Sequence, residues 1–335
     1  MSTFLITGGA GFIGSHLAEA ALTQGHRVLV LDDLSSGNVE NLSQIRSNPA
    51  FEFVPDSVAN EYVLAELVDR ADIVFHLAAT VGVFNIIESP VATILNNIGG
   101  TEAVLKMAAK KRKTVLVVST SEVYGKSQSI PFREDGDLVS GPTSKSRWSY
   151  ASSKIVDEFL ALAYWREQKV PTIVVRPFNC MGPRQTGRYG MVVPRFIDQA
   201  VSGSNVTVYG TGQQSRSFTY VSDIVQWMLA LAQNSKAVGE VFNLGNPNEI
   251  TMTDLAKRII TITGSSSGIE YISYEQAYEH GFEDIDRRIP DITKVTEVTG
   301  YHPTVGLDEA LRRTCDWIAS RAARTGSVVH AGALE

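Results

Sequence analysis

The chain has 335 residues, too many for one small hydrophobic core, and it fits one large α/β domain or two domains. Hydrophobic residues make up 44% and charged residues 20% of it, a globular composition that argues against a disordered protein. The formal charge of −6 leaves no basic surface for nucleic acid or for an anionic membrane. We therefore expect neither of these as a partner.

Cysteine usage and the first residues restrict the class of protein further. The chain has 2 cysteines, too few for a disulfide framework, and no cysteine–histidine cluster that suggests a metal site. It enters a strand-like run at once, with no signal-peptide pattern and no apolar stretch long enough to span a membrane. These features predict a cytoplasmic protein that holds no metal ion.

Short apolar runs alternate with longer amphipathic stretches along the first half of the chain. Most of the runs are continuously apolar, which is typical of parallel strands that are buried on both faces. The alternation predicts right-handed βαβ units and an α/β fold with a Rossmann-like, doubly wound parallel sheet. The expected strands are residues 4–7, 28–31, 51–54, 73–77, 115–119, 172–175 and 241–244, and the clearest helices are residues 13–24, 91–111 and 150–168.

A glycine-rich turn, TGGAGFIG at residues 7–14, joins the first expected strand to the first helix. Glycines there let the backbone approach a pyrophosphate, and the helix N-terminus offers unpaired N–H groups to it. Asp32 ends the second strand, where its carboxylate would accept hydrogen bonds from the adenosine ribose hydroxyls. Asp33 lies beside it and no arginine follows closely, so a 2′-phosphate would be repelled and NAD is favoured over NADP.

The ends of the next strands extend this cofactor site. Asp56 and Ser57 follow the third strand, where they would either meet the adenine or form an ordinary turn. The full set of predicted cofactor-binding residues is Gly8, Gly11, Phe12, Ile13, Gly14, Asp32, Ser36, Gly37, Asp56, Ser57, Leu77, Ala78, Ala79, Asn97, Tyr150 and Lys154.

The βαβ rhythm breaks after the sixth expected strand, where glycine, proline and arginine become frequent. We predict an NAD-binding Rossmann domain at residues 1–178, to which the chain returns around residues 217–245. Residues 179–216 and 246–322 would form a smaller, mixed substrate-binding lobe over the carboxyl ends of the strands, where open α/β folds bind ligands. Residues 323–335 are predicted to be a flexible tail.

Tyr150 and Lys154 would share one face of the helix at residues 150–168, so both can reach one pocket. A free tyrosine has a pKa of about 10 and is a poor base at neutral pH. Lowering that pKa to about 7 requires roughly 4 kcal/mol, which a neighbouring ammonium and an oxidised nicotinamide can supply. We therefore predict that Tyr150 is a catalytic base supported by Lys154.

Several motifs in order resemble one known family. TGGAGFIG is followed by HLAAT at residues 76–80, STSEVYG at 119–125, YASSK at 150–154, RPFNCMGPR at 176–184 and RSFTYVSD at 216–223. Over about residues 3–320 the chain resembles an extended short-chain dehydrogenase/reductase of the nucleotide-sugar epimerase/dehydratase/decarboxylase group.

The resemblance implies a mechanism. Tyr150 would remove the proton of the sugar O4 hydroxyl while a hydride passes from C4 to bound NAD, and Thr120 would hydrogen-bond the same oxygen. Lys154 would hold the nicotinamide ribose and stabilise the Tyr150 phenolate. The hydride later returns, so the cofactor is regenerated in each cycle.

The fate of the keto sugar depends on Ser121 and Glu122, the other two predicted catalytic residues. Sugar 4,6-dehydratases carry Thr-Asp-Glu at this place, and a serine hydroxyl is a far weaker acid than that aspartate. Thr-Ser-Glu instead resembles UDP-glucuronate decarboxylases, whereas the whole sequence resembles a bacterial group of sugar-nucleotide 4-epimerases. We put first a 4-epimerase acting on a UDP-linked hexose or hexuronate, with UDP-glucuronate decarboxylase as the alternative. A 4,6-dehydratase and a non-catalytic dinucleotide sensor rank lower.

The resemblance also implies substrate contacts and an assembly. Asn179 and Arg216 would hold the substrate diphosphate, and Val192 and Tyr209 would frame the base, for which we expect uracil. Arg288 would reach the reacting sugar or bind the diphosphate. The helices at residues 91–111 and 150–168 correspond to the pair through which the family forms dimers, so we expect a homodimer.

Overall fold

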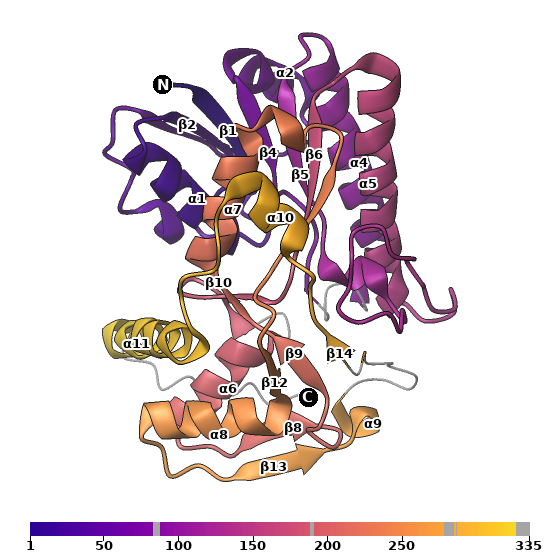
Figure 1. The fold of residues 1–335 in the computed structure, drawn as a ribbon. Helices are drawn as coiled ribbons and strands as arrows, with labels where there is room; N and C mark the ends of the chain where they lie inside the picture. Colours follow the sequence, from indigo (N-terminus) through magenta and orange to yellow (C-terminus); the bar gives the residue numbers. More distant parts are fainter. Residues whose placement is uncertain (83–87, 188–190, 278–284, 286, 326–335) are drawn as a thin grey trace.

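A seven-stranded parallel sheet forms the centre of the larger part of the molecule (Figure 1). The structure is a computed structural model, and it describes residues 1–335 except 83–87, 188–190, 278–284, 286 and 326–335. The strand order is β11-β6-β5-β4-β1-β2-β3, and every neighbouring pair is parallel. The strands are β1 (Thr3–Thr7), β2 (Arg27–Leu31), β3 (Phe51–Val54), β4 (Ile73–His76), β5 (Thr114–Val118), β6 (Thr172–Pro177) and β11 (Val241–Leu244).

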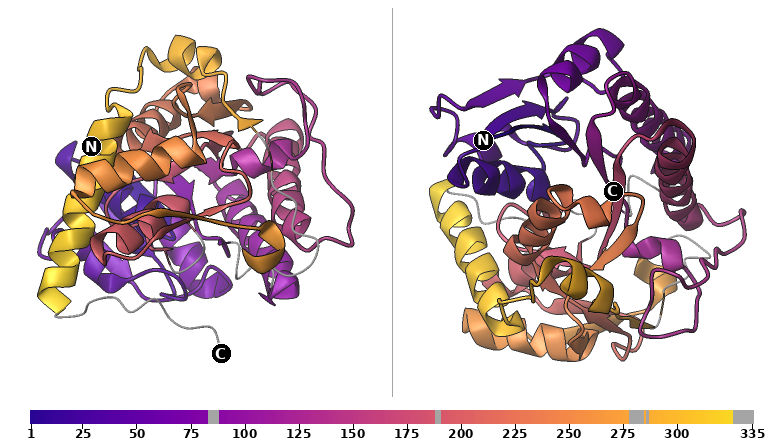
Figure 2. Two further views of the ribbon diagram at one scale, coloured as in Figure 1. Left: turned by 90° about the horizontal axis from the view of Figure 1, so that it is seen from below. Right: turned by 45° about the horizontal axis from the view of Figure 1, so that its top comes forward.

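Helices cover both faces of this sheet. On one face α1 (Phe12–Thr23) packs against α7 (Val221–Ala232), and on the other α4 (Pro90–Ala109) packs against α2 (Glu61–Arg70) and α5 (Arg147–Gln168). Figure 2 shows α4 and α5 running side by side at one edge of the molecule. The central strands are apolar on both sides because a helical layer buries each side. The predicted α/β, Rossmann-like doubly wound sheet is confirmed.

A smaller lobe is built from the chain that follows β6 (Figure 1). It holds a three-stranded sheet in the order β12-β9-β14 and a parallel pair, β13 with β8. Short 3₁₀ turns elsewhere in the chain are η1 (Val39–Leu42), η2 (Ser121–Tyr124) and η4 (Ser235–Ala237). The lobe elements are α6 (Val192–Val201), β8 (Val206–Tyr209), β9 (Ser215–Ser217), β12 (Glu249–Thr251), α8 (Met252–Thr263), β13 (Ile269–Ile272), α9 (Tyr274–Ala277), β14 (Arg287–Arg288) and α11 (Leu307–Thr325).

Three further elements connect the lobe to the large sheet. The pair β7 (Cys180–Met181) and β10 (Thr219–Tyr220) is parallel, and α10 (Thr293–Thr299) packs against α7 and β11. Part of the segment that we predicted as lobe thus contacts the Rossmann sheet, and the division at residue 178 stays a prediction. Of the predicted flexible tail, α11 includes the first residues, and the remainder lies outside the described residues. No described helix combines the length and the apolar character that crossing a membrane requires.

A buried ion pair ties α5 to the sheet. Arg176 on β6 donates to Glu158 on α5 through Nε at 2.9 Å and through Nη2 at 2.6 Å, and both side chains are buried. Arg176 also donates to the hydroxyl of Tyr124, which in turn donates to Asn243 on β11 at 2.7 Å. This network fixes the turn η2 and the N-terminal half of α5 relative to the strand ends.

Replacing Glu158 with glutamine should lower the free energy of unfolding by about 3 kcal/mol, because a buried guanidinium loses its counter-charge. Urea unfolding followed by tryptophan fluorescence measures this change. The matched control is Glu61→Gln, which breaks an exposed ion pair with Lys106 and should leave the unfolding midpoint in place. Equal midpoints for the wild type and Glu158→Gln would contradict the structural role of this pair.

Candidate active site

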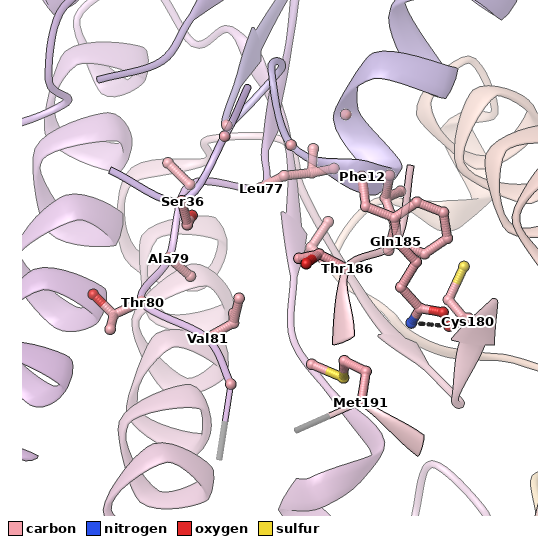
Figure 3. A pocket seen from close by; sticks show the side chains of 18 of the residues that line it. Phe12, Ser36, Leu77, Ala79, Thr80, Val81, Cys180, Gln185, Thr186 and Met191 are labelled. Atoms are coloured by element: carbon pink, nitrogen blue, oxygen red, sulfur yellow. Dashed lines mark hydrogen bonds between the residues drawn. The ribbon is translucent and has the colours of Figure 1, made fainter. Parts of the chain in front are cut away.

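One large cleft lies between the sheet and the lobe, at the carboxyl ends of β1, β4, β5 and β6. Its volume is about 1630 Å³, more than the roughly 300–1,000 Å³ of a pocket for one drug-sized molecule. Figure 3 shows Leu77, Ala79 and Thr80 on one side of it and Phe12 and Gln185 on the other. The cleft therefore has room for two ligands of nucleotide size.

Nearly all predicted site residues line this cleft. The predicted residues that it brings together are Gly8, Gly11, Phe12, Ile13, Gly14, Asp32, Ser36, Gly37, Asp56, Ser57, Leu77, Ala78, Ala79, Thr120, Ser121, Glu122, Tyr150, Asn179, Val192, Tyr209, Arg216 and Arg288. Two predicted cofactor-binding residues, Asn97 and Lys154, are buried behind its wall. The roles of all these residues stay predictions.

The glycine turn has the close approaches that a dinucleotide site requires. Gly8 has a φ of +71°, and a side chain on it would meet the backbone of Ala78 at 2.8 Å. A side chain on Gly14 would meet the carbonyl oxygen of Gly8 at 2.3 Å, so the first turn of α1 packs directly on the loop. Only glycine fits at these two positions, and the exposed helix N-terminus can then face a phosphate.

Asp32 ends β2 with its carboxylate held by two backbone groups. The N–H of Ala10 donates to Oδ2 at 2.9 Å and the N–H of Leu34 donates to Oδ1 at 2.8 Å. Burial raises the pKa of Asp32, and these two hydrogen bonds oppose that rise. A side chain on Gly37 would lie 2.7 Å from Oδ1, so this glycine lets the following loop close over the carboxylate. The arrangement fits a carboxylate that receives ribose hydroxyls.

Asn97 holds the loop after β4. Its Oδ1 accepts a hydrogen bond from the N–H of Thr80 at 2.8 Å, and its Nδ2 donates to the hydroxyl of Ser153 at 3.1 Å. This asparagine thus links the cleft wall to α5 from behind. Asn97 does not line the cleft, and its predicted contact with the cofactor stays a prediction.

Tyr150 and Thr120 meet in the cleft. Burial raises the pKa of Tyr150, the negative charge of Glu122 adds to the rise, and a hydrogen bond with the Thr120 hydroxyl opposes it. Thr120 also caps η2, since its hydroxyl accepts from the N–H of Glu122 at 3.2 Å. The phenol therefore stays protonated until a positive charge comes near it.

Glu122 lies among arginines. Arg288 donates to its Oε1 and, at 3.3 Å, to the hydroxyl of Ser121, while Arg147 donates to its Oε2 at 3.3 Å. Burial alone would raise the pKa of Glu122, but the positive charges of Arg288, Arg147 and Arg216 outweigh it and hold the pKa at about 2. Glu122 is thus a carboxylate throughout the neutral range and cannot donate a proton there.

Residues of the smaller lobe line the opposite part of the cleft. Arg216 on β9 is buried and donates to the carbonyl of Ser215 at 2.8 Å. Asn179 has a φ of +31°, and its Nδ2 donates to the carbonyl of Ser217 at 2.8 Å. The Arg195 guanidinium lies 3.9 Å from the ring centroid of Tyr209, which gives this end an aromatic face and positive charge. Such a wall suits a base and a diphosphate.

Some cleft residues were missing from the predicted set. Arg147 comes in KSRWSY, directly before the catalytic motif, and that motif was the available signal for it. Thr80 is the last residue of the motif HLAAT, which was the available signal for it, and Val81 follows directly. Gln185 and Gln214 lie in irregular segments, and nothing in their local sequence indicates a pocket. Within the part of the chain that the structure describes, no group of acidic, histidine and cysteine side chains is placed to hold a metal ion.

Two curated proteins resemble this chain over nearly its whole length. A UDP-N-acetyl-alpha-D-glucosaminuronate decarboxylase of Bacillus cytotoxicus is 44% identical over 314 residues, which span 93% of this chain and 96% of the relative. UDP-glucuronic acid decarboxylase 1 of Xenopus tropicalis is 36% identical over 310 residues, 92% of this chain and 70% of the relative. These relatives support the decarboxylase alternative better than the 4-epimerase that we put first.

Solved structures of epimerases share the fold. A UDP-glucuronic acid 4-epimerase of Bacillus cereus, in complex with UDP-glucuronic acid and NAD, superposes with a TM-score of 0.85 at 28% identity, covering 95% of this chain and 99% of that one. The family described as GDP-mannose 4,6 dehydratase matches residues 5–314. The resemblance noted in the sequence is confirmed, and the chain belongs to this family, among the nucleotide-sugar epimerases, dehydratases and decarboxylases of the extended short-chain dehydrogenase/reductase type.

Proposed function

We propose that the protein is an NAD-dependent decarboxylase of a UDP-linked hexuronate. The observation that carries this proposal is the group of Arg288, Arg147 and Glu122 beside Tyr150. The Nε of Arg288 is buried and has no hydrogen-bond partner among the described residues, so this donor is available to a ligand. A sugar carboxylate would satisfy it, whereas a neutral hexose offers no negative charge to this group of arginines.

The chemistry needs C4 oxidised first. NAD, when bound, would accept the hydride reversibly, and the glycine turn and Asp32 would hold the cofactor. Tyr150 takes the proton of the O4 hydroxyl as the hydride leaves C4, with the Thr120 hydroxyl donating to the same oxygen. The product is a β-keto acid, in which the carboxylate and the new carbonyl flank C5.

Loss of carbon dioxide then requires little further catalysis. The C5–C6 bond breaks, its electron pair moves toward the C4 carbonyl, and the resulting enolate oxygen is stabilised by Tyr150 and Thr120. Water would supply the proton that C5 gains in place of the lost carboxylate. Tyr150 would then return the proton that it took to the C4 oxygen, as C4 recovers its hydride from the reduced cofactor. Arg288 orients the carboxylate before the bond breaks, and Glu122, ionised at neutral pH, keeps the arginines in place.

Incubation of the purified protein with UDP-glucuronate, UDP-N-acetylglucosaminuronate and UDP-glucose tests the proposal. We expect carbon dioxide and a UDP-pentose-type product from a uronate, measured by isotope release and mass spectrometry, and no reaction with UDP-glucose. Tyr150→Phe should abolish turnover and leave NAD binding and the fold intact. An isomer of unchanged mass from either type of sugar would instead favour the 4-epimerase.

Arg288 and its neighbour provide a matched pair of variants. Arg288→Gln is expected to slow carbon dioxide release by about 100-fold, because a charged donor to the reacting group is lost. Arg287→Gln removes an arginine that is 54% exposed and paired with Glu249, and it should stay near the wild-type rate. Similar rates for the wild type and Arg288→Gln would contradict the role of the arginine group.

We also propose that the protein is a homodimer that forms through α4 and α5. Apolar side chains are exposed on this pair of helices, with Val91 on α4 70% exposed and Phe159 on α5 67% exposed. Exposed apolar side chains that gather on one face mark protein contacts. A second copy of the chain would cover them with the same two helices.

Sedimentation equilibrium measures this association. We expect a dimer for the wild type and a monomer for Phe159→Glu, since a carboxylate would be buried in the interface. Tyr62→Glu is the control, because Tyr62 is an exposed aromatic side chain on α2, outside the pair formed by α4 and α5. A monomeric wild type at all concentrations would overturn the proposed assembly.

A further inference from the structure

Three polar side chains form a line along one face of α5. Tyr150, Lys154 and Asp157 are separated by steps of four and three residues, which place them on a single helical stripe. Tyr150 lines the cleft, whereas Lys154 and Asp157 are buried in the interior. The stripe therefore runs from the reaction site into the protein, with the acid at its inner end.

Lys154 and Asp157 form an ion pair that is closed off from water. The ammonium Nζ donates to Oδ2 of Asp157 at 2.9 Å, and the side chains are 2% and 0% exposed. Burial raises the pKa of Asp157, while the charge of Lys154 and the Thr101 hydroxyl oppose the rise. Each ion of such a pair depends on the other, because neither has water to replace its partner.

The surroundings of Lys154 offer polar groups without negative charge. His76 on β4 shares a hydrogen bond with the Thr7 hydroxyl at 2.8 Å and another with the Thr101 hydroxyl at 3.2 Å. Burial lowers the pKa of His76 to about 3, and the Lys154 charge contributes to this, so the ring is neutral at neutral pH. The counter-charge that the described residues give Lys154 is that of Asp157.

The phenol of Tyr150 loses its proton less readily than an ordinary tyrosine does, so it depends more on a nearby cation. Burial raises its pKa, and the negative charges of Glu122 and Asp157 add to the rise. The titratable groups outside the stripe that interact electrostatically with it are His76 on β4, Glu122 in η2 and Glu158 on α5. Arg147 and Arg288 are paired with Glu122, and Arg176 is paired with Glu158.

We propose that Asp157 is a positioning residue for the oxidation step: it holds the Lys154 ammonium, charged and fixed in place, one helical turn from Tyr150. The lysine side chain has four rotatable bonds, and the buried carboxylate selects one arrangement of them. The net effect of Asp157 on Tyr150 is then favourable, although its own negative charge acts against the phenolate. This inference rests on the proposed role of Tyr150 as the base.

The test is the pH dependence of kcat/KM for Asp157→Asn. The acidic limb of the wild-type profile reports the deprotonation of Tyr150. Without the carboxylate, the ammonium is no longer held and the phenolate loses its cation, so we expect the limb to move up by at least one pH unit. At a pH on that limb the rate should fall at least tenfold, and Asp157→Glu should recover part of it.

Glu158→Gln is the matched control, since it also removes a buried carboxylate of α5 but one that is paired with Arg176. Glu158→Gln should lower the free energy of unfolding and leave the acidic limb of the kcat/KM profile at the wild-type pH. A limb that stays in place, or moves down, in Asp157→Asn overturns the proposal, because Asp157 would then only oppose the phenolate. If the asparagine variant does not fold, Asp157→Glu decides: a smaller upward shift supports the proposal and an unmoved limb overturns it.

The readout separates this inference from the proposed decarboxylation. Formation of bound NADH reports oxidation at C4, whatever happens to the keto sugar afterwards. A wild type that oxidises a nucleotide sugar without releasing carbon dioxide would refute the decarboxylase and still allow the pH profiles to be compared. A shifted limb in Asp157→Asn would then support the positioning role alone.

Discussion

The parallel arrangement of the central sheet is the constraint on which the site depends. Because all seven strands point the same way, the loops after β1, β2, β4, β5 and β6 meet at one edge. The glycine turn, Asp32, the segment from Leu77 to Thr80 and Thr120 therefore face one cleft, although they are far apart in the chain. The lobe closes the cleft from the opposite side and adds the residues that we propose for binding a nucleotide sugar.

Charge is distributed unevenly along this cleft. Beside Tyr150, where we propose that the sugar binds, Arg288 and Arg147 hold Glu122 ionised, and Arg216 lies close enough to add to the effect. A carboxylate with a pKa of about 2 acts as a fixed charge and has no part in proton transfer at neutral pH. In the proposed reaction, Tyr150 therefore carries out the proton transfer, and the arginines bind an anionic substrate. This separation of roles favours a uronate over a neutral sugar.

Helix α5 connects the fold with the chemistry. It carries Tyr150 at the cleft, Lys154 and Asp157 behind it, and Glu158 on Arg176 of β6. The two buried ion pairs lie next to each other in sequence and have separate tasks in our interpretation. One fixes the helix to the sheet, and the other fixes the ammonium relative to the phenol. Because both depend on the same helix, a shift of α5 would disturb the base and its support together.

Patterns along the chain were enough to predict the sheet, the glycine turn and the family, because strand periodicity and closely spaced motifs are local features. The sequence also named 22 of the residues that line the cleft, some because strand ends in a parallel sheet share an edge and others because they lie in motifs that resemble those of the family. Only the folded structure shows which charged side chains contact each other. Arg288 reaches Glu122 from a distant strand of the lobe, and Lys154 pairs with Asp157 in the protein interior. The pair of Arg288 and Glu122 depends on how separate elements pack, which no spacing along the chain records. The pair of Lys154 and Asp157 has a spacing that the sequence shows, three residues on one helix, and the structure adds its burial away from water.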